Sequence, residues 1–274
     1  MKVGLIQTRT PASHDAALAH VLPLVREAAA GGARLIATPE GTNILQRDRE
    51  VLLPQLRLIG EDVVVLGLQT AARDLGVWVL IGSALVRRED GKAANRLVLI
   101  DPAGAIVATY DKLHMFDVDL PGGTPTRESA TYEPGDRAVV HDIERLRFGL
   151  TICYDLRFPA LYRALAVAGA QVLAIPSAFT RPTGEAHWDV LMRARAIETG
   201  SYVIAPAQGG RHEDGRGTWG RTIAVGPWGE VLGKLDHDEP GVLFAELDPA
   251  DVAKARAAIP ALANARSFSG PLTA

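Results

Sequence analysis

Several features that assign chains to specialised classes are absent from these 274 residues. The chain has one cysteine, so no disulfide can form within it. It contains no block of basic residues and has a formal net charge of −3, which argues against a nucleic-acid partner. No apolar run approaches the roughly 20 residues that span a bilayer. We therefore expect neither nucleic acid nor membrane as a partner.

Targeting and metal-binding signals are also missing. The N-terminal segment MKVGLIQTR turns directly into a strand-like pattern, without the apolar core and cleavage site of a signal peptide. The chain has no HxxxH or CxxC spacing of the kind that clusters metal ligands. We therefore expect a cytoplasmic protein that uses no metal and no cofactor.

An internal repeat organises the chain. The segment LPLVREAAAGGARLIATPE resembles LYRALAVAGAQVLAIPS, because each has a helical apolar spacing, a glycine, a short apolar strand and a proline. Gly31 and Gly169 stand where helix C-caps are expected. The apolar runs at residues 34–38 and 171–175 are typical of strands that are buried on both faces.

The likeness continues further along the chain. LGLQTAARDLGVWVLIGSA resembles VLMRARAIETGSYVIAPAQ, and NRLVLIDPAGAIVATYDK resembles RTIAVGPWGEVLGKLD, where each member of the last pair reads as a β-hairpin. The openings KVGLIQT and RFGLTIC also match loosely. Two such copies predict an α/β protein with two sheets packed face to face and helices outside, which is a four-layer α-β-β-α sandwich.

The repeat also locates the chemistry. Glu40 follows the second strand of the first copy, Lys112 ends its hairpin, and Cys153 ends the first strand of the second copy. Sites in α/β proteins gather at the carboxyl ends of strands, and all three residues fall at such ends. A lone cysteine is often only a small buried hydrophobe, but this placement favours a functional thiol.

The cysteine segment, FGLTICYDLRFP, predicts a tight connection from a strand to a helix that begins near Pro159. Such a turn exposes a nucleophile and directs a backbone N–H toward the same point. The helix N-terminus and the charge of Arg157 are expected to favour the thiolate. The base is either a carboxylate beside a lysine or one of the histidines His114, His187 and His212.

Three motifs resemble the nitrilase superfamily of carbon–nitrogen hydrolases: ATPEGTN, YDKLHMFD and LTICYDLRFP. The resemblance implies that Cys153 is the nucleophile, that Glu40 is the general base, and that Lys112 stabilises the oxyanion with the backbone N–H of Tyr154. It also implies a supporting glutamate in PGGTPTRESATYEPGD, for which Glu128 is the best match and Glu133 the competing candidate. The resemblance fades after about Ala261. We therefore expect a single domain over residues 1–262 and a C-terminal tail over 263–274.

The stretch PSAFTRPTGEAHWDVLMRARAIETGSYVIAPAQGGRH is similar to the Nit branch, whose members act as deaminated-glutathione amidases and omega-amidases. This resemblance implies an enzyme that cleaves a small linear amide to acid and ammonia through a cysteinyl thioester. The amide is expected to be deaminated glutathione or another α-keto dicarboxylate monoamide, with Tyr154, Arg157, Phe179 and Thr180 around it. Arg157 can bind a substrate carboxylate in a fork, or it can pair with Asp155 or a backbone carbonyl.

Other functions remain open from the sequence. An N-carbamoyl amine or amino-acid hydrolase, or a nitrilase, would use the same three motifs. A catalytically silent binding protein on the same fold would usually have lost one of the three residues. Members of the superfamily usually pair through the sandwich, so we expect a homodimer or a higher homo-oligomer.

Overall fold

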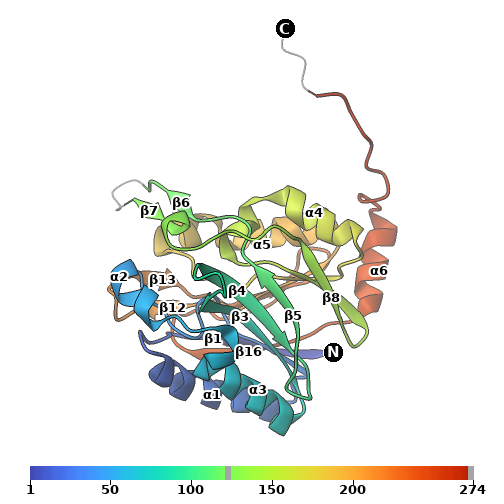
Figure 1. The fold of residues 1–274 in the computed structure, drawn as a ribbon. Helices are drawn as coiled ribbons and strands as arrows, with labels where there is room; N and C mark the ends of the chain where they lie inside the picture. Colours follow the sequence, from blue (N-terminus) through green and yellow to red (C-terminus); the bar gives the residue numbers. More distant parts are fainter. Residues whose placement is uncertain (121–124, 271–274) are drawn as a thin grey trace.

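Five strands from the first half of the chain and β16 (Gly241–Glu246) from near its end form one six-stranded sheet with helices on its outer face. The computed structural model describes residues 1–120 and 125–270 (Figure 1). The strand order is β16, β1 (Lys2–Gln7), β2 (Leu35–Ala37), β3 (Trp78–Arg87), β4 (Ala93–Ile100) and β5 (Ile106–Asp111). Helices α1 (His14–Ala30) and α3 (Val63–Leu75) pack on this sheet, and the short α2 (Arg49–Leu52) lies beside it.

The second half forms a matching sheet. Its strand order is β15 (Val231–Lys234), β14 (Ile223–Val225), β11 (Tyr202–Ala205), β10 (Val172–Ala174), β9 (Leu146–Leu150) and β8 (Val139–Ile143). Helices α4 (Pro159–Val167) and α5 (Arg181–Thr199) pack on this sheet, and α6 (Pro249–Ala258) follows β16. No helix among the described residues has the length and apolar character needed to cross a membrane.

The remaining elements are short and lie around the ends of the strands. They are the hairpins β6 (Asp117–Val118) with β7 (Thr126–Arg127) and β12 (Gly209–Arg211) with β13 (Gly217–Trp219), and the 3₁₀ turns η1 (Leu53–Gln55), η2 (Ile59–Glu61), η3 (Glu128–Ala130) and η4 (Cys153–Arg157). Two of these turns, η3 and η4, carry predicted site residues.

The two halves repeat the same topology, as the sequence predicts. In the first, β1, β2 and β3 are parallel neighbours, and β4 and β5 continue the sheet antiparallel. In the second, β9, β10 and β11 are parallel neighbours, and β14 and β15 continue antiparallel. The predicted four-layer α-β-β-α sandwich is confirmed (Figure 1). Each copy supplies one sheet and its helices, except that β16, which follows the second copy, is the edge strand of the first sheet.

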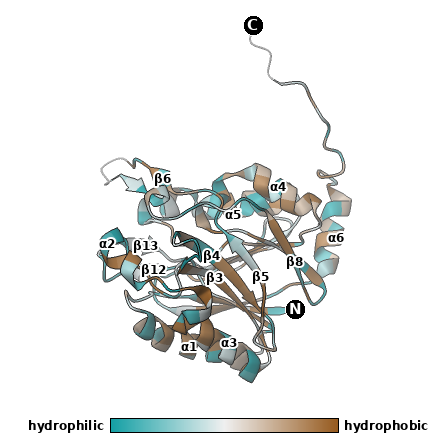
Figure 2. Cartoon of the chain, viewed as in Figure 1, coloured by the Kyte–Doolittle hydropathy of each residue, from teal (hydrophilic) through white to brown (hydrophobic). Residues whose placement is uncertain are grey.

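Side-chain alternation along the strands builds the layers. In β4, Leu97 and Leu99 belong to the core between the sheets, whereas Val98 and Ile100 belong to the core beneath α1 and α3. Successive residues of a strand point to opposite faces, so a strand buried on both faces must be apolar at nearly every position. Figure 2 shows this hydrophobic character along β3 and β4, between the helical layers.

The predicted helix C-caps differ in detail from the observed ones. Gly31 is the C-cap of α1 with a φ of −71°, so it does not need glycine's left-handed freedom. A Cβ on Gly31 would instead lie 2.3 Å from the Phe244 ring, so packing explains this glycine. Helix α4 ends with Ala168 as its C-cap, and Gly169, one residue later, has a φ of +95°.

The C-terminal segment after α6 runs away from the body of the molecule (Figure 1). The predicted boundary between domain and tail, at residues 262 and 263, stays a prediction. Residues 271–274 of that tail lie outside the described residues.

Gly82 of β3 packs closely against Pro176, beside the cysteine loop, and this packing predicts a stability effect. A Cβ on Gly82 of β3 would lie 2.4 Å from Pro176 and 2.6 Å from the Thr38 carbonyl oxygen. We expect Gly82→Ala to lower the free energy of unfolding by about 1–3 kcal/mol, because the core cannot absorb the methyl group. Urea unfolding measures the change. Gly60→Ala, where no atom lies within 4 Å of the added Cβ, is the matched control. Equal stability of the two variants would contradict the prediction.

Candidate active site

A cleft of about 610 Å³ opens at the carboxyl ends of the central strands. Its lining includes all eight residues that the sequence nominates, namely Glu40, Lys112, Glu128, Cys153, Tyr154, Arg157, Phe179 and Thr180. Residues from both halves of the fold therefore line a single cavity, although they are up to 140 positions apart in the sequence.

Cys153 lies on a strained turn at the first residue of η4. Its φ is +48°, in the left-handed region that costs a residue with a side chain about 1–2 kcal/mol. The Cys153 N–H donates to the Pro176 carbonyl at 2.9 Å, which holds the turn against the loop that follows β10. The chain then enters α4 at Pro159, as predicted. This geometry turns the thiol out of the sheet and into the cleft.

A buried carboxylate fixes this turn. Asp155 accepts hydrogen bonds from the Ile152 N–H at 2.9 Å and from the Tyr110 hydroxyl at 2.6 Å. It also accepts from the His114 N–H at 3.1 Å and lies 2.7 Å from the His114 ring Nδ1. Asp155 thus ties the cysteine turn to the segment that carries Lys112, and it is not the partner of Arg157.

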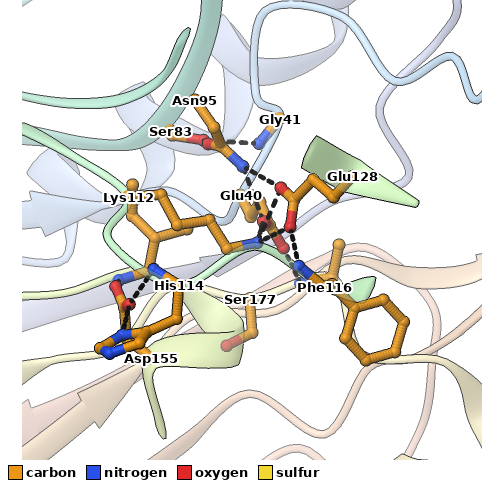
Figure 3. A network of polar contacts seen from close by, with 12 residues as sticks. Glu40, Gly41, Ser83, Asn95, Lys112, His114, Phe116, Glu128, Asp155 and Ser177 are labelled. Atoms are coloured by element: carbon orange, nitrogen blue, oxygen red, sulfur yellow. Dashed lines mark hydrogen bonds and ion pairs between the residues drawn. The ribbon is translucent and has the colours of Figure 1, made fainter. Parts of the chain in front are cut away.

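Lys112 lies between two glutamates at the base of the cleft (Figure 3). Its Nζ donates to Glu40 Oε1 at 2.8 Å and to the two carboxylate oxygens of Glu128 at 2.9 and 2.8 Å. The Lys112 side chain is 2% exposed. An ammonium so deeply buried is stable only with such partners, so the three residues form one ionic unit.

Neutral donors complete this unit. The Asn95 side-chain amide donates to Glu40 Oε1 at 2.9 Å and to Glu128 Oε1 at 3.2 Å. The Ala178 N–H donates to Glu40 Oε2 at 2.9 Å, and the Phe116 N–H donates to Glu128 Oε2 at 2.6 Å. Each carboxylate oxygen therefore has at least one donor, as buried charges require.

The ionic unit shifts the titration of its members. Burial alone would raise the pKa of Glu40, but the charge of Lys112 and hydrogen bonds from Lys112, Cys153 and Asn95 lower it below its usual value. Burial alone would lower the pKa of Lys112, but the charges of Glu128 and Glu40 raise it well above its usual value. At neutral pH Glu40 is therefore a carboxylate and Lys112 an ammonium.

The expectation of a resting thiolate is wrong. Burial and the negative charge of Glu40 raise the pKa of Cys153 well above its usual value, although Lys112 opposes them. Of the charged groups around the thiol, Glu40 has the largest effect on its pKa. Arg157 does not supply the expected charge, because its guanidinium faces His187 and the aromatic rings of the cleft wall. The cysteine is a neutral thiol beside a carboxylate, so it needs a base at the moment of attack.

The two candidate glutamates have different surroundings. Glu128 is the first residue of η3 and contacts Lys112 directly. Glu133 pairs instead with Lys92 at 3.0 Å, and its side chain is 45% exposed. The geometry therefore favours Glu128 as the supporting glutamate.

The histidine alternative finds no support in the geometry. His114 pairs with Asp155 and stacks on Phe158, with ring centroids 3.5 Å apart. The His187 ring accepts from Arg157. His212 contacts Thr218 at 2.7 Å, and burial lowers its pKa to about 4. The acceptor that contacts the thiol is therefore the Glu40 carboxylate.

One wall of the cleft combines an arginine with aromatic rings. The Arg157 guanidinium lies 5.9 Å from the Tyr154 ring centroid and 5.5 Å from that of Phe179. Its Nη atoms lie 3.3 and 3.2 Å from His187 Nδ1. Within the part of the chain that the structure describes, no carboxylate forms an ion pair with Arg157. This cation is held in place by neutral groups and can accept an anion from the cleft.

An oxyanion pocket is present in outline next to the thiol. The backbone N–H of Tyr154 follows Cys153 directly and donates no hydrogen bond to any described residue. The Lys112 ammonium lies on the other side, in contact with Glu40. Two donors beside a nucleophile can stabilise the charge of a tetrahedral intermediate.

Two residues of this network, Asn95 and Ser83, are not identified by the sequence motifs. Both lie within strands that are otherwise apolar, AANRLVLI and WVLIGSALVR. A polar side chain in a strand buried on both faces must have a specific partner, and that is the signal by which they could be found. Among residues 1–120 and 125–270, no group of three or more His, Cys, Asp or Glu side chains is arranged to hold a metal ion.

Comparisons with known proteins agree with this geometry. The sequence matches the carbon–nitrogen hydrolase family over residues 2–257. The deaminated glutathione amidase of Yersinia enterocolitica is 42% identical over 201 residues, which cover 72% of this chain and 70% of that protein. Nit3 of Saccharomyces cerevisiae, a member of branch 10 of the nitrilase superfamily, has a TM-score of 0.85 and 25% identity, covering 95% of this chain and 94% of that one.

A second solved structure bears on the cysteine. A mutant of the amidase from Nesterenkonia sp. AN1 has a TM-score of 0.79 and 28% identity, with 94% of each chain covered. In that protein the acetamide moiety of fluoroacetamide is covalently attached to the active site cysteine. From its sequence match and its fold, this chain belongs to the carbon–nitrogen hydrolase family of the nitrilase superfamily, as the resemblance of its three motifs predicted.

Proposed function

We propose that this carbon–nitrogen hydrolase is an amidase in which Cys153 is the nucleophile, Glu40 the general base, and Lys112 and Glu128 the supporting pair. The observation that carries the proposal is that the Cys153 thiol and the Glu40 carboxylate line the same cleft, with the pKa of the thiol raised and that of the carboxyl lowered. A thiol needs a base to become a nucleophile, and this carboxylate is in contact with it.

In the first half of the reaction, Glu40 takes the thiol proton as the Cys153 sulfur bonds to the amide carbon. The Lys112 ammonium and the Tyr154 N–H hold the oxyanion. Lys112 has three N–H donors and three carboxylate contacts, so donation to the oxyanion replaces one of its two contacts with Glu128. Glu40 then gives its proton to the nitrogen and the C–N bond breaks. The amine departs, and the acyl group remains bound to the Cys153 sulfur as a thioester.

In the second half, water attacks the thioester carbon while Glu40 takes a proton from it. The oxyanion forms in the same place and collapses as the C–S bond breaks. The sulfur recovers a proton from Glu40, and the carboxylic acid leaves. Glu128 keeps Lys112 in place throughout, because it contacts the ammonium through both oxygens at rest and one of these contacts remains while the oxyanion is bound.

We propose deaminated glutathione, or another α-keto dicarboxylate monoamide, as the substrate. The support is the name of the relative from Yersinia enterocolitica and the unpaired cation of Arg157 on the cleft wall. The α-keto acid end would meet Arg157 between Tyr154 and Phe179, with Thr180 at the edge of the same wall. Deaminated glutathione has a substituted amide, so its cleavage releases a peptide amine, whereas 2-oxoglutaramate releases ammonia.

We also propose a homodimer. Helix α5 and the hairpin of β14 and β15 expose large apolar side chains: Val190 is 68% exposed, Ile197 53%, Trp228 59% and Val231 46%. Arg193 donates to the Gly229 carbonyl at 2.7 Å, which joins the helix to the hairpin turn. Contiguous apolar side chains of this kind favour a partner surface, and a second copy presents the same face. A cytoplasmic location stays a prediction from the sequence.

Cys153→Ala is expected to reduce hydrolysis to background while amide binding persists, since the base and the oxyanion donors remain. The assay measures the ammonia released from 2-oxoglutaramate and the amine released from deaminated glutathione. An N-carbamoyl amino acid and a nitrile are tested in parallel as substrates of the alternative enzymes. Intact-mass spectrometry of the unaltered enzyme with a slow amide should show an acyl adduct that the variant lacks. Normal turnover by the variant would reject the mechanism. A chain that is inactive on the whole panel would indicate the silent binding protein instead.

Arg157→Lys is expected to raise KM for 2-oxoglutaramate roughly tenfold or more, because lysine cannot form the two-point contact with a carboxylate. A small neutral amide should be affected much less. Steady-state kinetics on the two amides measure the difference. Arg73→Lys on α3, whose side chain is 60% exposed, is the matched control. An equal loss on both amides would show that Arg157 does not recognise a carboxylate.

Val190→Asp is expected to shift the protein from dimer to monomer, because it places a charge in the apolar face of α5. Light scattering coupled to gel filtration measures the mass. Leu66→Asp is the matched control, because Leu66 lies on α3 in the opposite helical layer and is 43% exposed. This variant should leave the measured mass unchanged. A monomeric unaltered protein would contradict the proposed dimer.

A further inference from the structure

Asn95 contacts the two ionised glutamates of the site and the backbone of Lys112, although none of the three motifs contains it. Its side chain is in β4 and the residue is 2% exposed. One side-chain nitrogen, Nδ2, donates to both Glu40 and Glu128. The Asn95 backbone carbonyl accepts the Lys112 N–H at 3.0 Å. A single residue thus sets the relative position of two carboxylates and the lysine between them (Figure 3).

The orientation of the Asn95 amide is fixed by a second hydrogen bond. The Ser83 hydroxyl donates to Asn95 Oδ1, so the amide nitrogen must point toward the carboxylates. The Gly41 N–H donates to Ser83 Oγ at 3.3 Å. Gly41 follows Glu40 in the chain, so the contacts form a closed ring from the Glu40 carboxylate through Asn95 and Ser83 to the Glu40 backbone. A flipped amide would place its oxygen against two carboxylates.

The ring of hydrogen bonds leaves the two carboxylate oxygens of Glu40 with different numbers of free lone pairs. Glu40 Oε1 accepts from both Lys112 and Asn95, which occupies both of its lone pairs. Glu40 Oε2 accepts from the Ala178 N–H and retains one lone pair. The Cys153 thiol lines the same cleft as this carboxylate, and Oε2 is the oxygen with room for its proton.

We infer that Asn95 is a positioning residue that fills Oε1 of Glu40 and thereby reserves Oε2 for the proton of Cys153. The inference rests on the proposed role of Glu40 as general base. Ser83 supports it by keeping the amide in the donating orientation. Asn95 contacts no reacting atom itself, so its effect reaches the reaction through Glu40 and Glu128.

The ring of hydrogen bonds affects the pKa of Glu40 and therefore the pH dependence of kcat/KM. The titratable groups that face Glu40 are Lys112, Glu128, Cys153 and Tyr132. Among the neutral contacts, the Asn95 hydrogen bond lowers the pKa of Glu40, and burial opposes it. Loss of this bond therefore raises the pKa of Glu40. The base is then protonated at a higher pH, so the acid limb of the kcat/KM profile moves upward.

Asn95→Ala is the direct test, with two readouts on the folded full-length protein. The kcat/KM profile for the amide that the enzyme accepts should shift its acid limb upward by about one pH unit. The rate at which iodoacetamide alkylates Cys153 should show the same shift, since that reaction also needs the ionised base. We expect kcat to fall about tenfold and KM to change about twofold at most, because Asn95 is only 2% exposed and its amide nitrogen already donates to Glu40 and Glu128.

Asn43→Ala is the matched control. Asn43 is also buried and donates to a carboxylate, Asp62, at 2.7 Å, but that carboxylate belongs to the cap of α3. Its variant should lose thermal stability without moving either profile. Ser83→Ala should shift both profiles in the same direction as Asn95→Ala by a smaller amount, because the amide is then free to flip.

A folded Asn95→Ala variant with both acid limbs unmoved would overturn the inference. If that variant does not fold, the alkylation profile of Ser83→Ala decides, and an unmoved limb overturns it. The alkylation readout requires no substrate. A chain that cleaves none of the amides would therefore reject the proposed function while leaving the position of Asn95 testable.

Discussion

The contact of the Lys112 ammonium with Glu40 and Glu128 is the interaction on which the rest of the site depends. Moving an ion from water into a protein interior costs several kcal/mol even after relaxation, and here three ions share one buried location. Two negative charges face one positive charge, so the excess must be met by neutral donors. Asn95, Ala178 and Phe116 supply these donors. The strand that holds Asn95 and the loops that hold Ala178 and Phe116 are therefore placed by electrostatics as well as by packing.

The fold contains two copies of the same topology but only one charged cluster of this kind among the described residues. The first copy supplies Glu40 and Lys112, the second supplies Cys153, and Glu128 comes from the connection between them. In the alignment of the copies, Thr8 stands opposite Cys153 and Ser177 stands opposite Glu40. Thr8 donates to Gln208 at 3.0 Å and Ser177 donates to the Ile175 carbonyl at 2.9 Å. The repeat thus copies the scaffold, while uncharged residues at the counterpart positions avoid a second buried cluster.

Much of this arrangement could be predicted from the sequence because it depends on local patterns. Apolar runs, glycine stops and Pro-x-Gly turns define the two copies, and their topology then brings Glu40, Lys112 and Cys153 to neighbouring strand ends. The role of Asn95 could not be predicted in this way, because its partners lie 55 and 33 positions away in the sequence. Gly31 is the C-cap of α1 as predicted, but the reason for glycine there could not be predicted, since the Phe244 ring that excludes a side chain comes from the last strand.

The sequence predicts a Cys153 thiolate, which is wrong because the local signals differ from the total charge around the buried sulfur. A helix start and a nearby arginine are local signals, and each favours a thiolate when taken alone. The pKa of Cys153 depends instead on burial and on the sum of charges that the fold collects, among which the charge of Glu40 raises it most. The arginine is directed elsewhere by Tyr154 and Phe179. Sequence proximity is thus a poor guide to the field at a buried atom.

The same charge balance explains why attack and proton transfer belong to one step in the proposed mechanism. At rest the cluster carries two carboxylates, one ammonium and a neutral thiol, for a net charge of −1. A resting thiolate beside an ionised Glu40 would bring this to −2 in a buried site, and that is the state which the raised pKa of Cys153 disfavours. When the sulfur attacks as its proton moves to Glu40, the new negative charge appears on the substrate oxygen and the net charge stays at −1. The charge therefore moves from Glu40 to the oxyanion, between groups that Lys112 can contact, and the cluster stabilises the transition state without having to bury another ion.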